Sequence, residues 1–482
     1  MATAIPPNQA SFTLAELAAC SGGEVSAAAG SVRFRGITTD SRVVQPGQLY
    51  VALRGERHDG HAFLADAQAR GAAAALLAAS SGSGLPQVVV PDTRRALGQL
   101  GRLHRTRWGG KLVAITGSAG KTTTKELTAA ALRALGHSVL ATQGNLNNDI
   151  GLPMTLFGLG DEHDLAVVEI GTNAPGEIAW LADVAQPQVG VVTTVSLAHT
   201  QRLGSLDGVA DEKTALLRAL PREGVAIFGW DSAPLRARAE SFGPEQRLGF
   251  GREQGADLRL IRLALDADFR SHVAYSLHSE SRERSVELAL GGVGAALDAL
   301  AALAVVLGIY GEGSLAAAAA GLGGVQPLPG RMRPLLGSHG ALVIDDTYNA
   351  NPASMSASLR TLGELARVRG GRAIAALADM AELGVHSQAE HERIGREVVE
   401  LGLSDVFFCG RETAHAARAA KDEVRARRSK GPRVVHVADP LACVSELTRL
   451  LSARDAVLVK GSRALAMERL VEALSPQKGG AP

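Results

Sequence analysis

The chain has 482 residues, of which 46% are hydrophobic and 21% are charged, and its formal net charge at pH 7 is +1. This length is too great for one hydrophobic core, so the sequence predicts a globular protein of about two to four domains. The nearly neutral charge argues against nucleic acid and against an anionic membrane surface as partners, because both attract clustered lysine and arginine.

The cysteines and the apolar runs favour a cytoplasmic protein. Cys20, Cys409 and Cys443 lie far apart without metal-binding spacing, which is typical of reduced thiols in the cytosol. The N-terminus lacks the charged-then-apolar pattern of a signal peptide. The most apolar run, residues 295–309, contains Asp298 and is too short to span a bilayer. We expect no stable membrane insertion, and we expect a monomer.

Residues 1–108 predict a small α/β domain, in which short strands alternate with helices. Thr13 and Glu16 have the spacing of a capping box at the start of its first helix. The run Thr39-Asp40-Ser41-Arg42 combines small hydrogen-bond donors with a cation. Such a run can hold a nucleotide diphosphate, but taken alone it is more typical of a solvated turn.

A phosphate-binding loop is predicted in the second unit, residues 109–328. An apolar strand from Val113 leads into Gly117-Ser118-Ala119-Gly120-Lys121-Thr122-Thr123, and a helical pattern follows. Glycines allow backbone N–H groups to surround an anion, lysine adds a full charge, and the threonine hydroxyl can bind Mg²⁺. The usual pattern has a glycine where this chain has Ile115, so a chance Gly-Lys-Thr turn is the alternative interpretation.

Polar residues follow several later strands of this unit. An asparagine-rich segment, residues 145–153, is typical of a ligand-binding loop. Glu169 lies near the end of a buried strand, where parallel α/β sheets bind ligands, and it is a candidate Mg²⁺ ligand or else a helix cap or ion-pair partner. His199 follows the strand at 189–195 and has either a functional or a structural role. Repeated βα alternation predicts a mainly parallel sheet covered by helices on both faces.

The third unit, residues 329–482, is predicted to be a second α/β domain. It begins at the turn Pro329-Gly330-Arg331. The strand that starts at Ala341 ends in the polar run Asp345-Asp346-Thr347-Tyr348-Asn349-Ala350-Asn351-Pro352. Two further polar runs, residues 379–384 and 460–463, each follow a predicted strand.

Together these motifs resemble the Mur ligase family over essentially the whole chain. The loop at 116–123 is similar to the family's ATP loop, including its irregular first glycine. Narrower signals are the segments 145–153, 345–352, 379–384 and 460–463. The Tyr-Asn-Ala-Asn-Pro run looks like the member that adds a dipeptide. Residues 38–42 and 55–63 match the N-terminal domain that holds the UDP-sugar in this family.

The resemblance implies an ATP- and Mg²⁺-dependent amide ligase of peptidoglycan precursor synthesis, with UDP-N-acetylmuramoyl-tripeptide and D-alanyl-D-alanine as small-molecule substrates. The tripeptide carboxylate would attack the γ-phosphate of ATP, and the dipeptide amine would then displace phosphate from the acyl phosphate. The implied catalytic residues are Lys121, His199 and Lys213, the last matching a lysine that is carbamylated in close relatives. The implied binding residues are Gly117 to Thr123, Asn148, Arg331 and Asp346 for ATP, Thr39, Asp40, Ser41, Arg42, Asn349 and Asn351 for the other substrates, and Thr122, Glu169 and His199 for Mg²⁺.

The chain departs from the family pattern where adenine is expected to bind. A Gly-x-His-Asn-x-x-Asn run is replaced by the segment from Gly292 to Asp298, and an Asn-x-Asp-Asp run by Gly229-Trp230-Asp231-Ser232. Trp230 could replace the lost contacts by stacking on the base. Two alternatives stay open from the sequence: a folylpolyglutamate- or cyanophycin-type amide ligase, and a non-catalytic relative.

Overall fold

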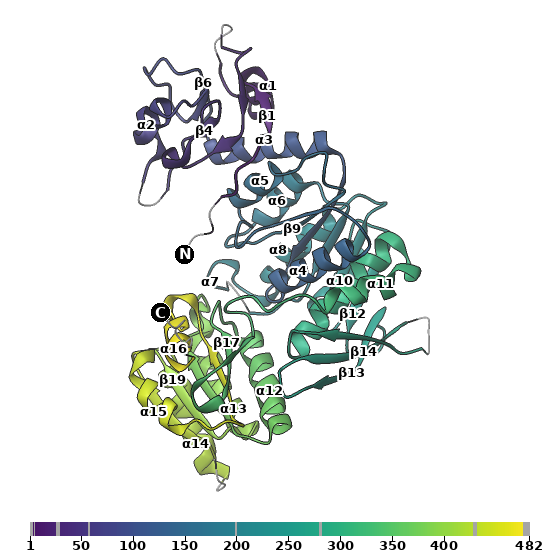
Figure 1. Cartoon of the computed structure of the whole chain (residues 1–482), viewed down its shortest axis with the longest axis vertical. Coiled ribbons are helices and arrows are strands. Elements are labelled where there is room, and N and C mark those ends of the chain that lie inside the picture. Colours follow the sequence, from purple (N-terminus) through teal and green to yellow (C-terminus); the bar gives the residue numbers. More distant parts are fainter. Residues whose placement is uncertain are drawn as a thin grey trace, which may run out of the picture.

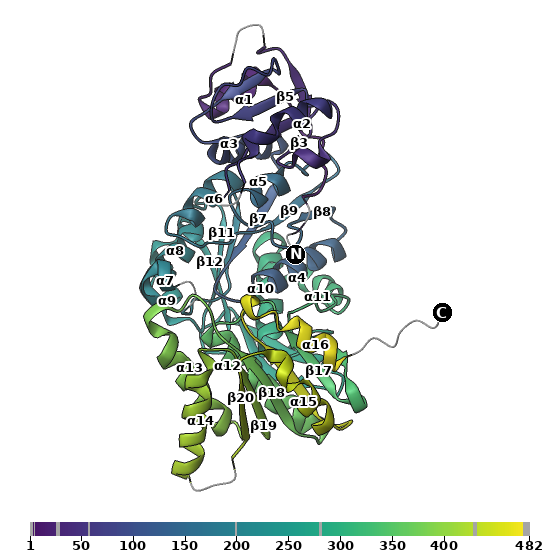
Figure 2. The ribbon, with the colours of Figure 1, turned by 90° about the vertical axis from the view of Figure 1, so that its left-hand side faces the viewer.

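The computed structural model describes residues 3, 5–25, 29–55, 58–197, 200–278, 282–427 and 431–475. It has the predicted α/β fold, with its units arranged one after another along the long axis (Figures 1 and 2). The N-terminal unit lies at one end, the nine-stranded sheet in the middle and the C-terminal unit at the other end. The predicted boundaries at 108/109 and 328/329 fall between strands of different sheets, and we keep them as a proposal.

The N-terminal unit contains a small antiparallel pair and a parallel four-stranded sheet. The pair is β1 (Ser11–Thr13) with β2 (Arg33–Arg35), and the sheet is β3 (Ile37–Thr38), β4 (Leu49–Val51), β5 (Ala74–Leu77) and β6 (Gln87–Val89), in that order. Its helices are α1 (Leu14–Ser21), α2 (Leu64–Ala69) and α3 (Thr93–Trp108). Thr13 and Glu16 form the predicted capping box at the start of α1. Helix α3 packs on α5 (Gly151–Leu156) and α6 (Glu177–Ala185) and so connects this unit to the central one.

The central sheet has nine strands in the order β15-β14-β13-β12-β11-β10-β7-β9-β8. The strands are β7 (Lys111–Thr116), β8 (Val139–Ala141), β9 (Leu165–Glu169), β10 (Val189–Val192), β11 (Val225–Gly229), β12 (Gln246–Gly251), β13 (Leu258–Leu265), β14 (Ser271–Leu277) and β15 (Arg284–Leu288). Strands β8 to β13 pair in parallel, as predicted, whereas β13, β14 and β15 form an antiparallel edge. This edge also explains the charged, strand-like pattern of residues 236–287, since an edge sheet can leave one face in water.

Helices cover both faces of the central sheet. One face carries α4 (Lys121–Ala134), α10 (Val293–Tyr310) and α11 (Leu315–Leu322), and the other carries α5 (Gly151–Leu156), α6 (Glu177–Ala185) and α8 (Leu206–Arg218). Alternate residues of β7 enter the two cores: Val113 and Ile115 face α4 and α10, while Leu112 and Ala114 face α6 and α8. Short helices α7 (Thr200–Leu203) and α9 (Ala233–Arg236) complete the unit.

Helix α10 is longer than the apolar run predicted from the sequence. It has 18 residues, and among the described residues it is the one helix with the length and composition of a membrane span. The expectation that this run is too short to span a bilayer was therefore wrong. The helix packs between α4, α11 and strands β11 to β13, and ten of its residues are buried there, so its apolar character is explained by the core.

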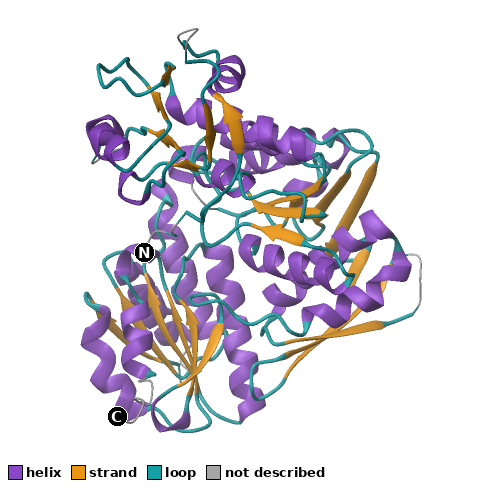
Figure 3. Ribbon diagram, turned by 45° about the horizontal axis from the view of Figure 1, so that its top comes forward, coloured by secondary structure: helices purple, strands orange, loops and turns teal. Residues whose placement is uncertain are grey.

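The C-terminal unit has a six-stranded sheet in the order β16-β17-β21-β18-β19-β20. Its strands are β16 (Arg333–Leu336), β17 (Leu342–Asp346), β18 (Ala373–Ala378), β19 (Asp405–Cys409), β20 (Arg433–Val437) and β21 (Ala456–Lys460), and only β16 is antiparallel among these described strands. Helices α12 (Pro352–Arg369), α13 (Ser387–Glu400) and α14 (Thr413–Arg427) cover one face, and α15 (Val444–Leu450) and α16 (Glu468–Leu474) cover the other. Figure 3 shows the sheets with helices packed beside them.

Candidate active site

The predicted phosphate loop joins β7 to α4, and its backbone requires glycine at two positions. Gly117 has a φ of 148° and Gly120 a φ of 83°, a region that residues with a side chain rarely adopt. A Cβ on residue 117 would also lie 1.9 Å from Oγ1 of Thr193. The Ser118 amide donates to the Thr194 carbonyl at 2.8 Å, which fixes the loop to the end of β10. The loop thus lies beside the N-terminus of α4, whose unpaired N–H groups suit an anion.

Lys121 opens α4 and places its ammonium group within this loop. Its Nζ donates to the carbonyl of Gly117 at 2.8 Å. Burial lowers the pKa of Lys121; the Glu169 carboxylate opposes that shift and Arg331 adds to it. The ammonium group is thus positioned where phosphate oxygens would meet the loop.

Glu169 ends β9 and is buried beside the loop. Its Oε2 accepts a hydrogen bond from Thr122 Oγ1 at 2.7 Å, and its Oε1 accepts one from Asn147 Nδ2 at 2.7 Å. Carboxylate and hydroxyl oxygens fit Mg²⁺, which commonly keeps waters and substrate phosphates as its other ligands. The part of the chain that the structure describes has no cluster of three or more His, Cys, Asp or Glu residues that could form a closed metal cage. The donor set therefore fits a magnesium ion that is shared with a phosphate.

Replacing Glu169 by glutamine is expected to raise the Mg²⁺ concentration needed for half-maximal activity by about tenfold or more, because an amide oxygen carries no charge. An assay of the expected ligase activity, run at increasing Mg²⁺ concentrations, measures this change. Glu162→Gln removes an exposed carboxylate, 71% accessible, from the same unit and serves as the matched control. An unchanged magnesium requirement in Glu169→Gln would contradict the ligand role.

The asparagine-rich segment contains two neighbouring asparagines with different hydrogen-bond partners. Asn147 bonds to Glu169, whereas Asn148 Oδ1 accepts the Gly151 amide at 2.8 Å and thereby supports the start of α5. Asn148 also lines the cleft described below, so its proposed contact with ATP stays a prediction. Only the geometry of the turn decides which of the two adjacent asparagine side chains meets Glu169.

Lys213 lies on α8, is 1% exposed, and makes no hydrogen bond or ion pair with the other described residues. Burial lowers its pKa well below the ordinary value, and Lys121 lowers it further, while the carboxylates of Glu212, Glu169 and Glu177 oppose the shift. Lys213 is therefore a weaker base than an ordinary lysine. His199, predicted as a catalytic residue and metal ligand, lies outside the described residues.

Glu212, which the sequence analysis missed, organises the wall beside Lys213. Its carboxylate accepts hydrogen bonds from the amides of Gly176 at 2.7 Å and Ile178 at 2.8 Å and from Thr172 Oγ1 at 3.2 Å. These bonds join α8 to the start of α6. No local pattern reveals them, because the partners lie 34 to 40 residues away.

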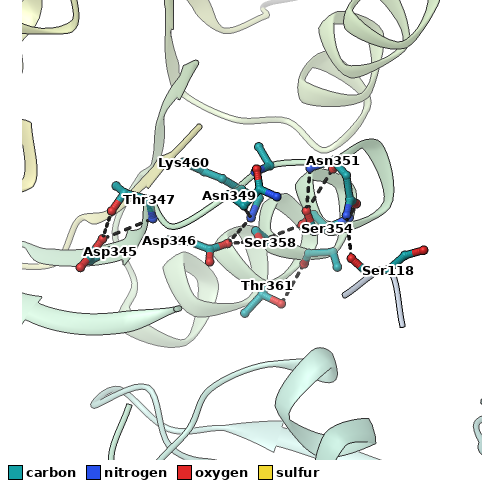
Figure 4. A network of polar contacts seen from close by, with 12 residues as sticks. Ser118, Asp345, Asp346, Thr347, Asn349, Asn351, Ser354, Ser358, Thr361 and Lys460 are labelled. Carbon is teal, nitrogen blue, oxygen red and sulfur yellow. Dashed lines mark hydrogen bonds and ion pairs between the residues drawn. The ribbon is translucent and has the colours of Figure 1, made fainter. Parts of the chain in front are cut away.

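The C-terminal unit brings a network of polar side chains to the same place (Figure 4). Asp346, at the end of β17, accepts hydrogen bonds from Lys460 Nζ at 2.5 Å and from Ser358 Oγ at 2.7 Å. Lys460 Nζ also donates to the Asn349 carbonyl at 3.3 Å. The carboxylate predicted to contact ATP is thus paired with a lysine and fixes the loop that carries Asn349.

Asn351 connects this network to the phosphate loop. Its Oδ1 accepts the Ser354 amide at 2.9 Å as the N-cap of α12, and its Nδ2 donates to the Ser118 carbonyl at 3.2 Å (Figure 4). A second bond between the two units runs from the Gln201 amide to the Glu382 carbonyl at 3.2 Å. The third unit therefore contacts the loop that is expected to bind ATP.

Two substitutions of Asn351 separate its roles as cap and as bridge. Asn351→Ala should lower the free energy of unfolding by about 1 kcal/mol, because the N-cap of α12 is lost. Asn351→Ser should keep the cap but lose the bond to Ser118, so stability should stay near wild type while turnover falls. Urea unfolding and steady-state kinetics measure the two effects. Equal turnover in Asn351→Ser and wild type would show that the bridge has no part in the reaction.

Arg331 supplies a cation opposite Lys121. Its guanidinium lies 4.0 Å from the centre of the Tyr348 ring, and Arg463 lies 5.3 Å from the same ring. Stacking on an aromatic ring orients a guanidinium without consuming its N–H donors. Arg331 can therefore still donate hydrogen bonds into the cleft that it lines.

All three units contribute to a cleft of about 1130 Å³ around these residues. Arg94 lies at its N-terminal side, the phosphate loop in its middle and Tyr348 at its C-terminal side. The predicted site residues that line it are Ser118, Ala119, Gly120, Lys121, Thr123, Asn148, Glu169, Lys213, Arg331, Asp346, Asn349 and Asn351. Gly117 and Thr122 lie behind this surface, as part of the loop and as the partner of Glu169.

The predicted UDP-sugar residues Thr39, Asp40, Ser41 and Arg42 do not line this cleft. Arg42 is 84% exposed and forms an ion pair with Asp40 at 2.7 Å, and its hydrogen bond lowers the pKa of the Asp40 carboxyl. Asp40 also accepts the Arg42 amide and so caps a short turn. The structure thus has the solvated turn, and sugar binding by these residues stays a prediction.

The Trp230 ring packs against the neighbouring strand β12. A Cβ on Gly249 would lie 2.7 Å from its indole, and its Nε1 donates to the Gln254 carbonyl at 3.2 Å. Its neighbours Gly229 and Asp231 line the cleft, but Trp230 does not. The hypothesis that Trp230 stacks on adenine therefore has no support in the geometry, because the ring packs on strand β12.

Comparisons with known proteins agree with this arrangement along the whole chain. Three family models match: the Mur ligase family catalytic domain at residues 33–105, the Mur ligase middle domain at 115–306, and the Mur ligase glutamate ligase domain at 330–463. The UDP-N-acetylmuramoyl-tripeptide–D-alanyl-D-alanine ligase of Escherichia coli is 36% identical over 474 residues, covering 96% of this chain and 98% of that protein.

Solved structures give the same result. A crystal structure of MurF from Acinetobacter baumannii has a TM-score of 0.85 and 31% identity, covering 98% of this chain and 100% of that one. The MurF ligase from Thermotoga maritima in complex with ADP has a TM-score of 0.79 and 27% identity, covering 91% of this chain and 96% of that one. The chain belongs to the Mur ligase family.

Proposed function

We propose that this protein is an ATP-dependent ligase that joins D-alanyl-D-alanine to UDP-N-acetylmuramoyl-tripeptide in peptidoglycan precursor synthesis. The observation that carries the proposal is the shared cleft, in which the phosphate loop with Lys121 and Glu169 faces Arg331 and Asn349 of the C-terminal unit. The whole-chain similarity to ligases of that name supports the same substrates.

The arrangement suits two successive transfers. The tripeptide carboxylate attacks the γ-phosphorus of ATP, the bond to the β-phosphate oxygen breaks, and ADP leaves. The dipeptide amine then attacks the acyl carbon, loses a proton, and releases phosphate as the amide forms. Lys121, Arg331 and the loop N–H groups stabilise the negative charge of the transferring phosphoryl group, which is the main demand of such a reaction.

Thr122 and Glu169 are the residues that we propose for Mg²⁺. When bound, the ion would neutralise phosphate charge. Asp346 and Lys460 neutralise each other, so we assign them to holding the Asn349 loop against the nucleotide. The cytoplasmic location, the monomeric state and the UDP-sugar role of residues 39–42 stay predictions.

The test is a coupled measurement of phosphate release and of the product mass. The purified chain receives ATP, MgCl₂, D-alanyl-D-alanine and UDP-N-acetylmuramoyl-tripeptide, with either lysine or diaminopimelate as the third residue. We expect phosphate release and a pentapeptide product, and little of either when L-alanyl-L-alanine replaces the D-dipeptide. Folded protein that releases no phosphate with either tripeptide would refute the proposal.

A further inference from the structure

Asp298 is a buried carboxyl group that lies against the phosphate loop and has no ion-pair partner in the part of the chain that the structure describes. It is 8% exposed, and it lines the cleft. Its Oδ1 accepts a hydrogen bond from Thr124 Oγ1 on α4 at 3.1 Å. It also packs on the loop itself, because a Cβ on Gly120 would lie 2.3 Å from this oxygen. Its second oxygen has no hydrogen-bond partner among the described residues.

The two lysines of α4 are engaged elsewhere. Lys121 Nζ bonds to the Gly117 carbonyl, and Lys125 Nζ bonds to the Thr142 carbonyl at 2.6 Å and to Glu126 at 2.6 Å. Arg331 stacks on Tyr348. Helix α11 and strands β10 and β11, which also pack on α10 or border it, have no charged residue.

The other elements packed against α10 carry charges that belong to different neighbours. Arg247 of β12 pairs with Glu240, Arg262 of β13 with Glu283, and Arg360 of α12 with Glu397. The remaining titratable or charged groups on these elements are Arg133 of α4, Arg259 of β13, His272 and Tyr275 of β14, Glu312 of η4 (Glu312–Ser314), and Glu364, Arg367 and Arg369 of α12. Arg331 is the charged group that acts on Asp298.

Burial has a large effect on this carboxyl group. It raises the pKa of Asp298 to about 8, and the Thr124 hydroxyl and Arg331 oppose the shift. The side chain is thus mainly a neutral carboxylic acid at pH 7, with one O–H donor available.

We propose that Asp298 is part of the nucleotide site and that the site binds nucleotide tightly only while this carboxyl group is neutral. The inference rests on the proposed function, since it takes the loop to be the ATP site. A carboxylate at this position would lie across Gly120 from the polyphosphate, and like charges repel strongly in a poorly solvated pocket. The neutral acid removes that repulsion and can donate its O–H to the nucleotide.

The test is calorimetric binding of ADP and ATP to the full chain between pH 7 and 9.5. The wild-type dissociation constant should rise about tenfold per pH unit above pH 8, in proportion to the loss of the neutral form. Asp298→Asn keeps the size of the side chain and cannot ionise. The pH dependence of its nucleotide affinity should therefore reflect only the other titrating groups, including Lys121. Thr124→Val removes a hydrogen-bond donor that favours the ionised form of Asp298. The rise of its dissociation constant should therefore occur at higher pH than in wild type.

The outcomes separate this inference from the proposed function. Parallel pH profiles for wild type and Asp298→Asn overturn the role of Asp298 and leave the ligase assignment intact. Absence of nucleotide binding at every pH overturns both. Thermal unfolding verifies folding: because the pKa is higher in the folded than in the unfolded state, wild type should lose stability as pH rises from about 4 to about 8, and Asp298→Asn should not show that loss.

Discussion

Replacing Lys121 by alanine is expected to lower the turnover number by about 10³-fold or more, because a full charge beside the transferring phosphoryl group is lost. The thermal midpoint should stay within a few degrees of wild type. Among the described residues, the Lys121 ammonium group makes one hydrogen bond, to the Gly117 carbonyl, and its desolvation opposes folding, so little net stabilisation is lost. Phosphate release at saturating substrates and thermal unfolding measure the two effects.

Lys125 is the matched control for this experiment. It lies one turn further along α4, is 1% exposed, and bonds to the Thr142 carbonyl and to Glu126. Lys125→Ala should therefore lower the thermal midpoint, while the protein that remains folded still binds nucleotide. If Lys121→Ala instead unfolds the chain as Lys125→Ala does, Lys121 is structural and the phosphate-loop assignment loses its main residue.

The elements of the site that were predictable are those with a local pattern. A strand, a glycine turn and a helix identified the loop from Val113 to Lys125 because each part has its own sequence preference. Glu169 followed from a topological rule, since a polar residue at the end of a buried parallel strand lies where ligands bind. The structure places its Oε2 2.7 Å from Thr122 Oγ1, so the two predicted magnesium ligands are neighbours, and their binding of the ion stays a prediction.

The contacts that were not predictable depend on tertiary packing. Nothing in the sequence indicates that Glu212 caps α6, that Asn147 rather than Asn148 meets Glu169, or that Asn351 reaches Ser118 across 233 residues. For Trp230, the sequence suggested a contact that the structure does not support. A tryptophan after a strand end suggested base stacking, but Gly249 of β12 and Gly255 beyond it leave room for its ring against that part of the chain.

The second large effect concerns Lys213. Replacing it by alanine is expected to lower turnover by about 10²-fold or more, because the cleft loses a polar group fixed beside Glu169 and Lys121. The lowered pKa of Lys213 favours its neutral amine, and a neutral amine can add CO₂ to form a carbamate with release of one proton. The product has a carboxylate-like negative charge, which suits a metal-binding pocket.

Carbamylation makes a prediction that a plain structural lysine does not share. Wild-type protein in ¹³C-bicarbonate should show a carbamate carbon signal in NMR spectra, and Lys213→Ala should lack it. Activity should fall in CO₂-free buffer and return when bicarbonate is added, whereas the residual activity of Lys213→Ala should not respond. Lys213→Arg keeps a cation and cannot be carbamylated, so activity near wild type in that variant would exclude the carbamate. Loss of activity in both variants without a carbamate signal would instead assign Lys213 a role as an amine.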